Sequence, residues 1–191
     1  MELREILTKI YPLPEDSLDR IVCEADEIVF DRNTVIIEAD RIEKYIYFVK
    51  SGLLRAYVLT DGREITFWIG QEGAVALSME SYINHQPGYE SIATLEPTVL
   101  YRIPSEKLAG LYETDIHIAN WGRKFAETEI IRAERSLIPH LSTTATDRYE
   151  NLLNQNPALL NRIPLEKLAS YLGITPVSLS RIRGKLGRKQ D

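Results

Sequence analysis

The chain has 191 residues, of which 44 % are hydrophobic and 27 % charged, and one cysteine. This composition is typical of globular proteins. No segment approaches the roughly 18 consecutive apolar residues that cross a bilayer, and the charged N-terminus lacks the apolar core of a signal peptide. A single cysteine, Cys23, excludes an intramolecular disulfide and a thiolate metal site. We therefore expect a cytoplasmic protein with no membrane partner, cofactor or metal.

The charge is distributed unevenly along the chain. The net charge is −5, yet residues 161–191 hold seven basic and two acidic residues, a net charge of +5. The other 160 residues hold 16 basic and 26 acidic residues, a net charge of −10. An acidic body with a basic end suits a protein that contacts a polyphosphate through one part only.

The first hundred residues change from a helical to a β-rich pattern. Apolar residues at helical spacing predict two short helices separated by Pro12 and Pro14. From about residue 25 to 103, short β-rich runs alternate with turn signals, and Asp61-Gly62 indicates a tight hairpin. The predicted strands are 27–30, 35–38, 45–50, 53–59, 64–69, 89–95 and 99–103. Such strands are typical of an antiparallel β roll of the jelly-roll type.

A long helix is predicted from Thr114 to Leu141, with Pro139 ending or bending it. Residues spaced alternately four and three apart form one stripe on this helix: Ala119, Arg123, Ala126, Ile130, Ala133 and Leu137. We interpret this stripe as the seam of a homodimer. The alternative is a helix that buries one broad face in its own domain. A second stripe is expected to pack on the β roll: Ile118, Trp121 and Phe125.

The strongest functional motif of the sequence is a helix-turn-helix predicted over residues 165–183. A short helix is predicted before it, over 146–153, and Asn156-Pro157 closes that helix. Two helices that cross steeply need a small residue at the crossing and a turn that tolerates positive φ, which Ala169 and Gly173 supply. Thr175 is the expected N-cap of the second helix, about 176–186. The expected buried residues are all aliphatic: Leu168, Leu172, Ile174, Leu179 and Ile182.

In such a unit the second helix enters the major groove with its N-terminal residues at the base edges. The candidates for base readout are Pro176, Val177, Ser180 and Arg181. Arg181 is the main one, because pairing with guanine O6 and N7 gives about 1–3 kcal/mol of discrimination. The candidates for phosphate contacts are Thr175, Ser178, Arg183 and Lys185. A dimer would place two such helices about 34 Å apart on a near-palindrome of double-stranded DNA.

The order of β roll, long helix and helix-turn-helix resembles the Crp/Fnr family of bacterial transcription regulators. Residues 172–183 are similar to the recognition segment of that family, with Ser180-Arg181 at its Ser/Gly-Arg pair, and residues 45–57 are similar to its glycine-containing hairpin. The resemblance implies an α+β fold with a sensor domain (1–113), a dimerisation helix (114–141) and a DNA-binding domain (142–191). It also implies a small-molecule effector in the roll and RNA polymerase as a partner.

The chain departs from the family at the cyclic-nucleotide pocket. The Gly-Glu turn that takes the ribose is replaced by Glu72-Gly73-Ala74, and the arginine segment that holds the phosphate is replaced by Tyr89 and Glu90. A buried phosphate needs a paired cation, and Glu90 would repel it. These five residues are the candidate effector pocket, and we expect no tight binding of cAMP or cGMP. We also expect no wing, the hairpin that follows the recognition helix in the family, because only residues 187–191 follow that helix here.

Two other function classes fit the sequence less well. A metal-dependent jelly-roll enzyme needs several histidines on adjacent strands, whereas only His85 lies near the roll, and no nucleophile motif or phosphate loop is present. We therefore expect no enzymatic activity. The remaining alternative is an effector-binding or interaction module that has lost DNA binding, as the short tail and the apolar Pro176-Val177 would allow.

Overall fold

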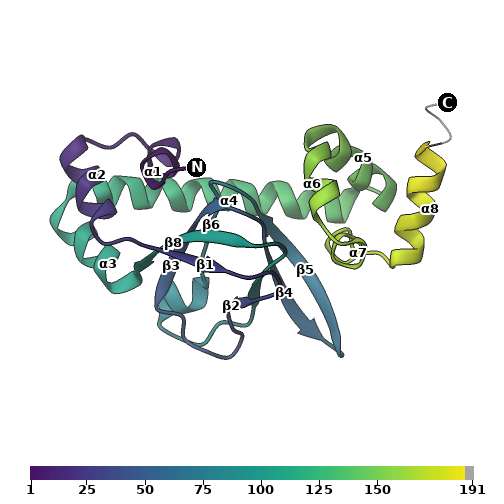
Figure 1. Cartoon of the computed structure of the whole chain (residues 1–191), viewed down its shortest axis with the longest axis horizontal. Coiled ribbons are helices and arrows are strands. Elements are labelled where there is room, and N and C mark those ends of the chain that lie inside the picture. Colours follow the sequence, from purple (N-terminus) through teal and green to yellow (C-terminus); the bar gives the residue numbers. More distant parts are fainter. Residues whose placement is uncertain (188–191) are drawn as a thin grey trace.

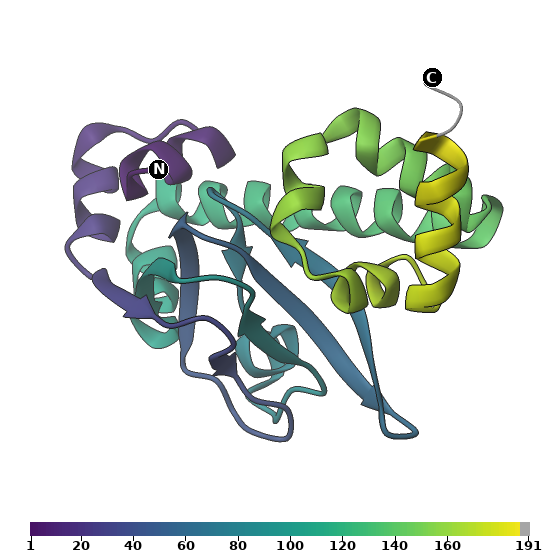
Figure 2. The same ribbon diagram turned by 45° about the vertical axis from the view of Figure 1, so that its right-hand side comes forward.

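A long helix, α4 (Ile116–Ser142), runs along the molecule and joins its two ends in the computed structural model, which describes residues 1–187 (Figure 1). At one end lie α1 (Leu3–Ile10), α2 (Glu15–Val22) and α3 (Ser105–Thr114). At the other end lie α5 (Ala145–Gln155), α6 (Pro157–Arg162), α7 (Leu165–Tyr171) and α8 (Pro176–Gly187). The strands lie beneath α4, between the two helical groups (Figures 1 and 2).

Two four-stranded antiparallel sheets form the β part, which confirms the predicted α+β fold. One sheet has the order β1 (Asp26–Phe30), β8 (Thr98–Pro104), β3 (Tyr45–Ser51) and β6 (Val75–Ala76). The other has the order β2 (Val35–Ile37), β7 (Ser91–Thr94), β4 (Leu54–Thr60) and β5 (Arg63–Gly70). All seven predicted strands are present. The sequence did not indicate the two-residue β6 or the short π-helix η1 (Glu80–Asn84), which are too short to show a period.

The β4–β5 hairpin closes as predicted. Asp61 and Gly62 have φ values of 51° and 72°, the left-handed conformation that a two-residue turn between Thr60 and Arg63 requires. The outer strand of this hairpin, β5, is an edge of its sheet. Unpaired backbone groups on an edge strand need a cover, and the C-terminal helices provide one, as described below.

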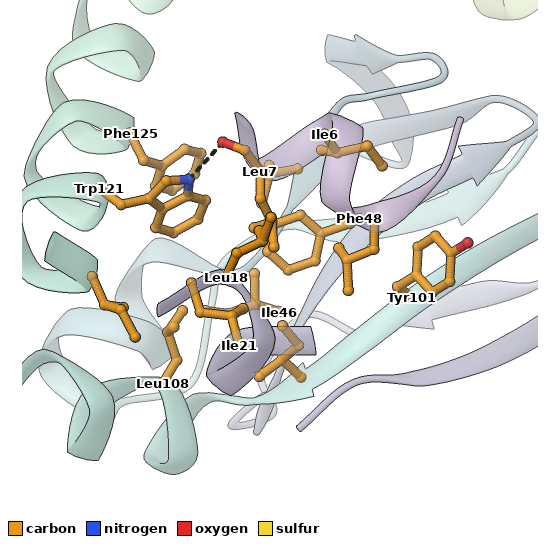
Figure 3. Close-up of a cluster of buried hydrophobic side chains, with 14 residues drawn as sticks. Ile6, Leu7, Leu18, Ile21, Ile46, Phe48, Tyr101, Leu108, Trp121 and Phe125 are labelled. Atoms are coloured by element: carbon orange, nitrogen blue, oxygen red, sulfur yellow. Dashed lines mark hydrogen bonds between the residues drawn. The ribbon is translucent and has the colours of Figure 1, made fainter. Parts of the chain in front are cut away.

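The largest core lies between the first sheet and the helices at the N-terminal end (Figure 3). The stripe of Ile118, Trp121 and Phe125 is buried there, as predicted. The indole N–H of Trp121 donates to the carbonyl oxygen of Leu7 (2.9 Å), and its ring stacks on Phe125 with centroids 5.8 Å apart. The hydrogen bond fixes the first half of α4 to α1, and the core shared with Phe48 of β3 packs it on the roll.

The second half of α4 leaves this core. Within residues 1–187, the side chains of Ile130 and Leu137 are 69 % and 58 % exposed. The other seam residues Arg123, Ala126 and Ala133 are exposed as well, and Ala119 is half-buried. The alternative of one broad face buried in the same domain therefore fails for this half. No helix in the described part of the chain is long and apolar enough to cross a membrane.

The structure adds two details about helix ends. Pro139 does not end α4, which continues to Ser142. Asn156 and Pro157 do close α5, but they also begin a helix that the sequence did not indicate, α6. The Asn156 side chain accepts a hydrogen bond from the N–H of Leu159 (3.2 Å), and Pro157 occupies the first helical position, where a missing N–H has no cost. The expected absence of a wing concerns residues that mostly lie outside the described part, 188–191.

Candidate nucleic-acid interface

The turn between α7 and α8 is built around Gly173. Its φ of +69° is the left-handed conformation that glycine adopts without strain. The N–H of Gly173 donates to the carbonyl of Ser170 (3.0 Å), and the N–H of Ile174 donates to that of Ala169 (3.0 Å). This pair of bonds is the Schellman motif, which satisfies the last carbonyl groups of a helix. It redirects the chain sharply from α7 into α8 (Figure 2).

The start of α8 is capped as the sequence predicts. The N–H of Ser178 donates to Oγ1 of Thr175 (3.1 Å), and the two hydroxyl groups are 2.9 Å apart. Pro176 follows the cap at the first helical position. Both side chains that the sequence assigns to phosphate contacts at this end, Thr175 and Ser178, therefore already hold the helix N-terminus.

The helix-turn-helix has a core of its own. Leu168, Ala169, Leu172 and Leu179 are at most 2 % exposed in one cluster. The other two expected core residues, Ile174 and Ile182, are partly buried against that cluster. Two residues of the β roll, Leu53 and Leu95, belong to the same cluster. The unit is therefore a folded helix-turn-helix that shares apolar surface with the roll.

The side of α8 away from this core is exposed. Pro176, Val177, Ser180 and Arg181, the residues assigned to base readout, are all exposed, and the Val177 side chain is 61 % exposed. Arg181 and Lys185 line a groove of about 250 Å³ between α5 and α8. The described part of the chain thus leaves this side of α8 open to solvent.

Arg183 is placed differently from the other predicted phosphate contacts. Its guanidinium lies 5.7 Å from the ring centroid of Tyr149 on α5, and its Nε is buried without a hydrogen-bond partner in the described structure. A cation over an aromatic face contributes about 0.5–2 kcal/mol. Arg183 therefore packs α8 onto α5. Of the two basic residues predicted to contact phosphates, Arg183 and Lys185, Lys185 is the more exposed.

Gly184 gives a test of whether the exposed face of α8 meets a ligand closely. A Cβ on Gly184 in α8 or on Gly110 in α3 would have no neighbour within 4 Å. Alanine at either position should stabilise the protein by about 0.5–1 kcal/mol, because glycine loses more backbone entropy in a helix. Urea unfolding of G184A and G110A measures this. We expect DNA affinity to fall only for G184A. Equal stabilisation with unchanged DNA affinity in both variants would show that no DNA backbone comes close to Gly184.

The helix-turn-helix docks on the edge strand β5 through α7. The hydroxyl of Ser170 donates to the carbonyl of Glu64 (2.8 Å) and accepts from the N–H of Thr66 (2.8 Å). Nζ of Lys167 lies 2.5 Å from Oε2 of Glu64, which also accepts from the buried Arg55. One serine thus satisfies two backbone groups that an edge strand leaves unpaired.

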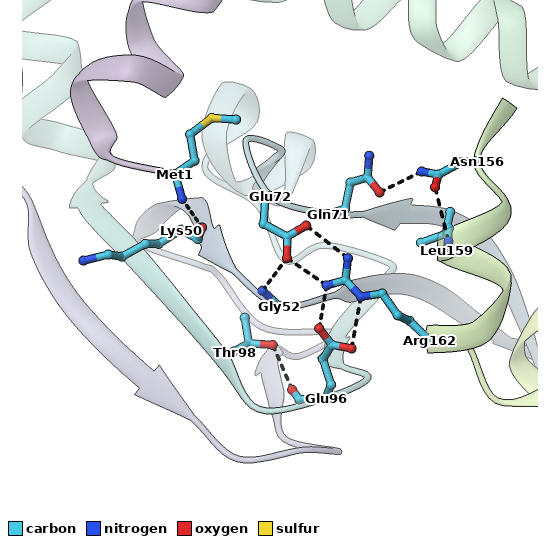
Figure 4. A network of polar contacts seen from close by, with 10 residues as sticks. All are labelled: Met1, Lys50, Gly52, Gln71, Glu72, Glu96, Thr98, Asn156, Leu159 and Arg162. Carbon is cyan, nitrogen blue, oxygen red and sulfur yellow. Dashed lines mark hydrogen bonds and ion pairs between the residues drawn. The ribbon is translucent and has the colours of Figure 1, made fainter.

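A second docking contact centres on Arg162 at the end of α6 (Figure 4). Its Nη2 donates to Oε1 of Glu72 (2.8 Å) and Oε1 of Glu96 (2.5 Å), and its Nε and Nη1 reach the remaining carboxylate oxygens. Glu72 Oε1 also accepts from the N–H of Gly52 (3.0 Å). Nearby, the Asn156 side chain donates to Gln71 (2.9 Å). We call Arg162, Glu72 and Glu96 the interdomain clamp.

The clamp is insensitive to pH near neutrality. Partial burial alone would raise the pKa of Glu72, but the hydrogen bonds from Arg162 and Gly52 outweigh it and lower this pKa from 4.5 to about 2. A carboxyl group with a depressed pKa stabilises the folded arrangement fully above its unfolded pKa. That stabilisation is lost only as the pH falls from about 4.5 towards 2. The clamp therefore stays intact between pH 5 and 8.

The five residues of the candidate effector pocket lie in different surroundings. Glu72 faces the C-terminal helices as part of the clamp. A Cβ on Gly73 (φ +86°) would stand 3.0 Å from Sδ of Met1, and the carbonyl of Ala74 accepts a hydrogen bond from the N–H of Val49 on β3 (2.9 Å). Tyr89 is 64 % exposed, whereas Glu90 is 5 % exposed. His85 and His117 are exposed, and residues 1–187 contain no cluster of three metal-ligating side chains.

The chain is similar to known proteins both in sequence pattern and in fold. Residues 27–115 match the family model of the cyclic nucleotide-binding domain. A putative transcriptional regulator of the Crp/Fnr family from Eubacterium rectale is 20 % identical over 95 % of this chain and 88 % of its own, with a TM-score of 0.75. In fold, the chain is Crp/Fnr-like.

Other solved structures share this Crp/Fnr-like fold. FixK2 from Bradyrhizobium japonicum is 20 % identical, with 87 % of this chain and 86 % of that chain covered and a TM-score of 0.73. CLP from Xanthomonas campestris, a c-di-GMP responsive global regulator, is 16 % identical, with 93 % of both chains covered and a TM-score of 0.73. No curated protein sequence matches the chain. The matched family model describes a binding domain, and CLP and the Eubacterium rectale protein are described as regulators.

Proposed function

We propose that the protein is a sequence-specific DNA-binding transcription regulator that acts in the cytoplasm. The observation that carries this proposal is the exposed face of α8, with Val177, Ser180 and Arg181 presented on a helix whose other side is anchored in a core. A helix held this way can enter the major groove. The net charge of +5 over residues 161–191 supports contact with phosphates, since the rest of the chain is acidic.

We propose further that α4 is the dimerisation helix. Five large apolar side chains on its second half are at least 45 % exposed: Ile130, Ile131, Leu137, Ile138 and Leu141. A stripe of this kind is covered when two copies of the helix pair. The dimer would carry two reading helices, which suits a near-palindromic site. On this proposal residues 1–113 form the sensor domain and residues 142–191 the DNA-binding domain, with RNA polymerase as a further partner.

The β roll is then the sensor, and its effector is not a cyclic nucleotide. Glu90 is buried, and no cation pairs with it in the described structure. A phosphate beside an unpaired buried carboxylate is repelled, and the repulsion is strong where the dielectric is low. Glu72, the other acidic residue of the candidate pocket, is already occupied by Arg162.

The experiment that tests DNA recognition uses Arg181. After selection of a preferred site from random DNA, fluorescence anisotropy should show that R181A raises the Kd for that site by about 5- to 150-fold, which corresponds to 1–3 kcal/mol. Specificity should relax at one base in each half-site.

Lys185 provides the matched control for this experiment. K185A should weaken binding to all sequences alike and reduce the slope of log K against log[salt] by about one per protomer, as a phosphate contact does. If R181A weakens all sequences equally, Arg181 does not read a base. If the wild-type protein shows no salt-dependent DNA binding, the alternative of an effector-binding or interaction module replaces the regulator.

A further inference from the structure

Three segments of the β roll surround a buried acidic position that the clamp and the DNA-binding domain do not use. They are the loop 40–44, the segment 78–85 containing η1, and the loop 86–90. The N–H of Glu43 donates to Oγ of Ser81 (3.0 Å), and the N–H of Gly88 donates to the carbonyl of Arg41 (3.2 Å). The hydroxyl of Ser81 also donates to the carbonyl of Gln86 (3.0 Å). The three segments are therefore tied together as one unit.

Glu90 is the unusual residue of this unit. It is 5 % exposed, and its Oε2 is buried without a hydrogen-bond partner in the described structure. Gly88 lies beside it: a Cβ there would stand 3.3 Å from both carboxylate oxygens of Glu90 and 2.3 Å from Oγ of Ser78. The Ser78 hydroxyl and the Glu90 carboxylate therefore both lie against Gly88, and a side chain at position 88 would collide with the hydroxyl.

A buried carboxylate without a partner is costly, because it has lost its hydration and gained no counter-charge. Buried polar groups in native proteins almost always have a partner. The Glu90 carboxylate would be stabilised by a positively charged group that donates a hydrogen bond to it. A metal ion is disfavoured, since the described residues contain no cluster of three metal-ligating side chains.

The same three segments expose large apolar side chains. They are between 48 % and 64 % exposed: Ile42, Met79, Ile83 and Tyr89. Single exposed apolar residues are common on protein surfaces, but here four of them occupy the segments that enclose one buried acid. An apolar rim with one polar group beneath it is the usual chemistry of a small-molecule site.

We propose that this unit binds an organic cation with an apolar body, whose ammonium or amidinium group pairs with Glu90 and whose apolar part lies against the rim. The inference rests on the proposal that the roll is a sensor, and it names the chemical class of the effector. It assigns the site to Glu90, Ser78 and the rim, and leaves Glu72 to the interdomain clamp.

The test is a thermal-shift and calorimetric titration of the full-length protein, without DNA, with 2-phenylethylamine and its uncharged counterpart 2-phenylethanol. At one hundred times its Kd, the amine should raise Tm by about 5–10 °C. The alcohol should bind at least about tenfold more weakly, because it cannot form the charge-assisted bond. E90Q should lose this discrimination. E38Q, which removes an exposed carboxylate paired with Arg41, should retain it.

Three results would overturn the proposal: equal shifts with amine and alcohol, an amine shift that persists in E90Q, or tight binding of cAMP by the wild-type protein. The comparison of amine with alcohol needs no variant, so the test holds even if E90Q does not fold. DNA binding is measured separately on the same preparation. An amine shift without DNA binding would contradict the proposed function alone, and DNA binding without an amine shift would contradict this inference alone.

Discussion

Glutamate at both Ile130 and Leu137 of α4 is expected to convert the dimer into monomers and to weaken binding to a two-half-site DNA by at least about 100-fold. Both side chains are more than half exposed in the single chain, one heptad apart. Covering an aliphatic side chain contributes about 1.5–3 kcal/mol, and the pairing of two copies would cover four of them. In a dimer, binding at one half-site holds the second helix-turn-helix near the other half-site, which raises affinity by about 10²–10⁴. A monomer loses this gain.

Sedimentation equilibrium measures the assembly state, and anisotropy measures the DNA affinity. The control is R132E, which also places a glutamate on α4 but lies two residues beyond Ile130, on the opposite side of the helix. Its partner in the chain is Glu129 on the same helix. R132E should remain dimeric. A dimer that survives I130E/L137E, or a monomer in R132E, would show that the subunits pair through another surface.

Removal of Arg162 is expected to release the helix-turn-helix from the roll. R162A leaves the carboxylates of Glu72 and Glu96 facing one another without the cation that both bind. These side chains are about 28–35 % exposed, so solvent screens part of the interaction. We expect a loss of about 1–3 kcal/mol at the interface, intermediate between exposed and buried ion pairs. The open arrangement should then be populated about 5- to 150-fold more.

The amide of Thr66 reports this opening directly, because its hydrogen bond goes to Ser170 of the docked helix. Its hydrogen exchange, followed by NMR, should accelerate in R162A by the same factor. R162K keeps the positive charge, but an ammonium group lacks the planar set of N–H donors with which a guanidinium binds two carboxylates. The exchange rate of the Thr66 amide in R162K should therefore lie between those of the wild type and R162A. Unchanged exchange at Thr66 in R162A would mean that the β5 contact alone holds the domain.

DNA affinity distinguishes two roles for the clamp. The described contacts involve α6 and α7, while the exposed residues of α8 remain accessible. On the proposed function, we therefore expect the clamp to orient α8 on DNA rather than to cover it. R162A should weaken binding to a two-half-site DNA more than binding to a single half-site. Tighter binding by R162A to the two-half-site DNA would show instead that the clamp inhibits DNA binding.

The parts of the fold that the sequence predicts well are those with a local pattern. The alternation of the strands, the positive φ at Asp61-Gly62 and the spacing of Ala169 and Gly173 all depend on residues within a few positions of each other. The buried stripe around Trp121 follows from helical period alone. These features confirm that local chemistry is sufficient to indicate the helix-turn-helix and the roll.

The docking of the two domains has no such local pattern. Arg162 lies 66 and 90 residues from its two partners, and Ser170 lies 104 residues from Thr66. Nothing in a single sequence links residues so far apart. The family pattern predicts Glu72 and Glu90 in one pocket; in the structure Glu72 pairs with Arg162, and Glu90 is buried. The stacking of Arg183 on Tyr149 was missed for the same reason.

The continuity of α4 has a mechanical consequence. The helix is held in the roll by Trp121, and near its other end Nε2 of His140 lies 3.2 Å from the carbonyl oxygen of Tyr171 in the reading unit. These two anchors are about 28 Å apart along the axis. A rigid rod of that length turns a tilt of about 5° at the roll into a displacement of about 2–3 Å at the helix-turn-helix. A hydrogen bond to a base tolerates only a few tenths of an ångström. On the proposed function, a small angular change in the roll would therefore move α8 out of register with the DNA.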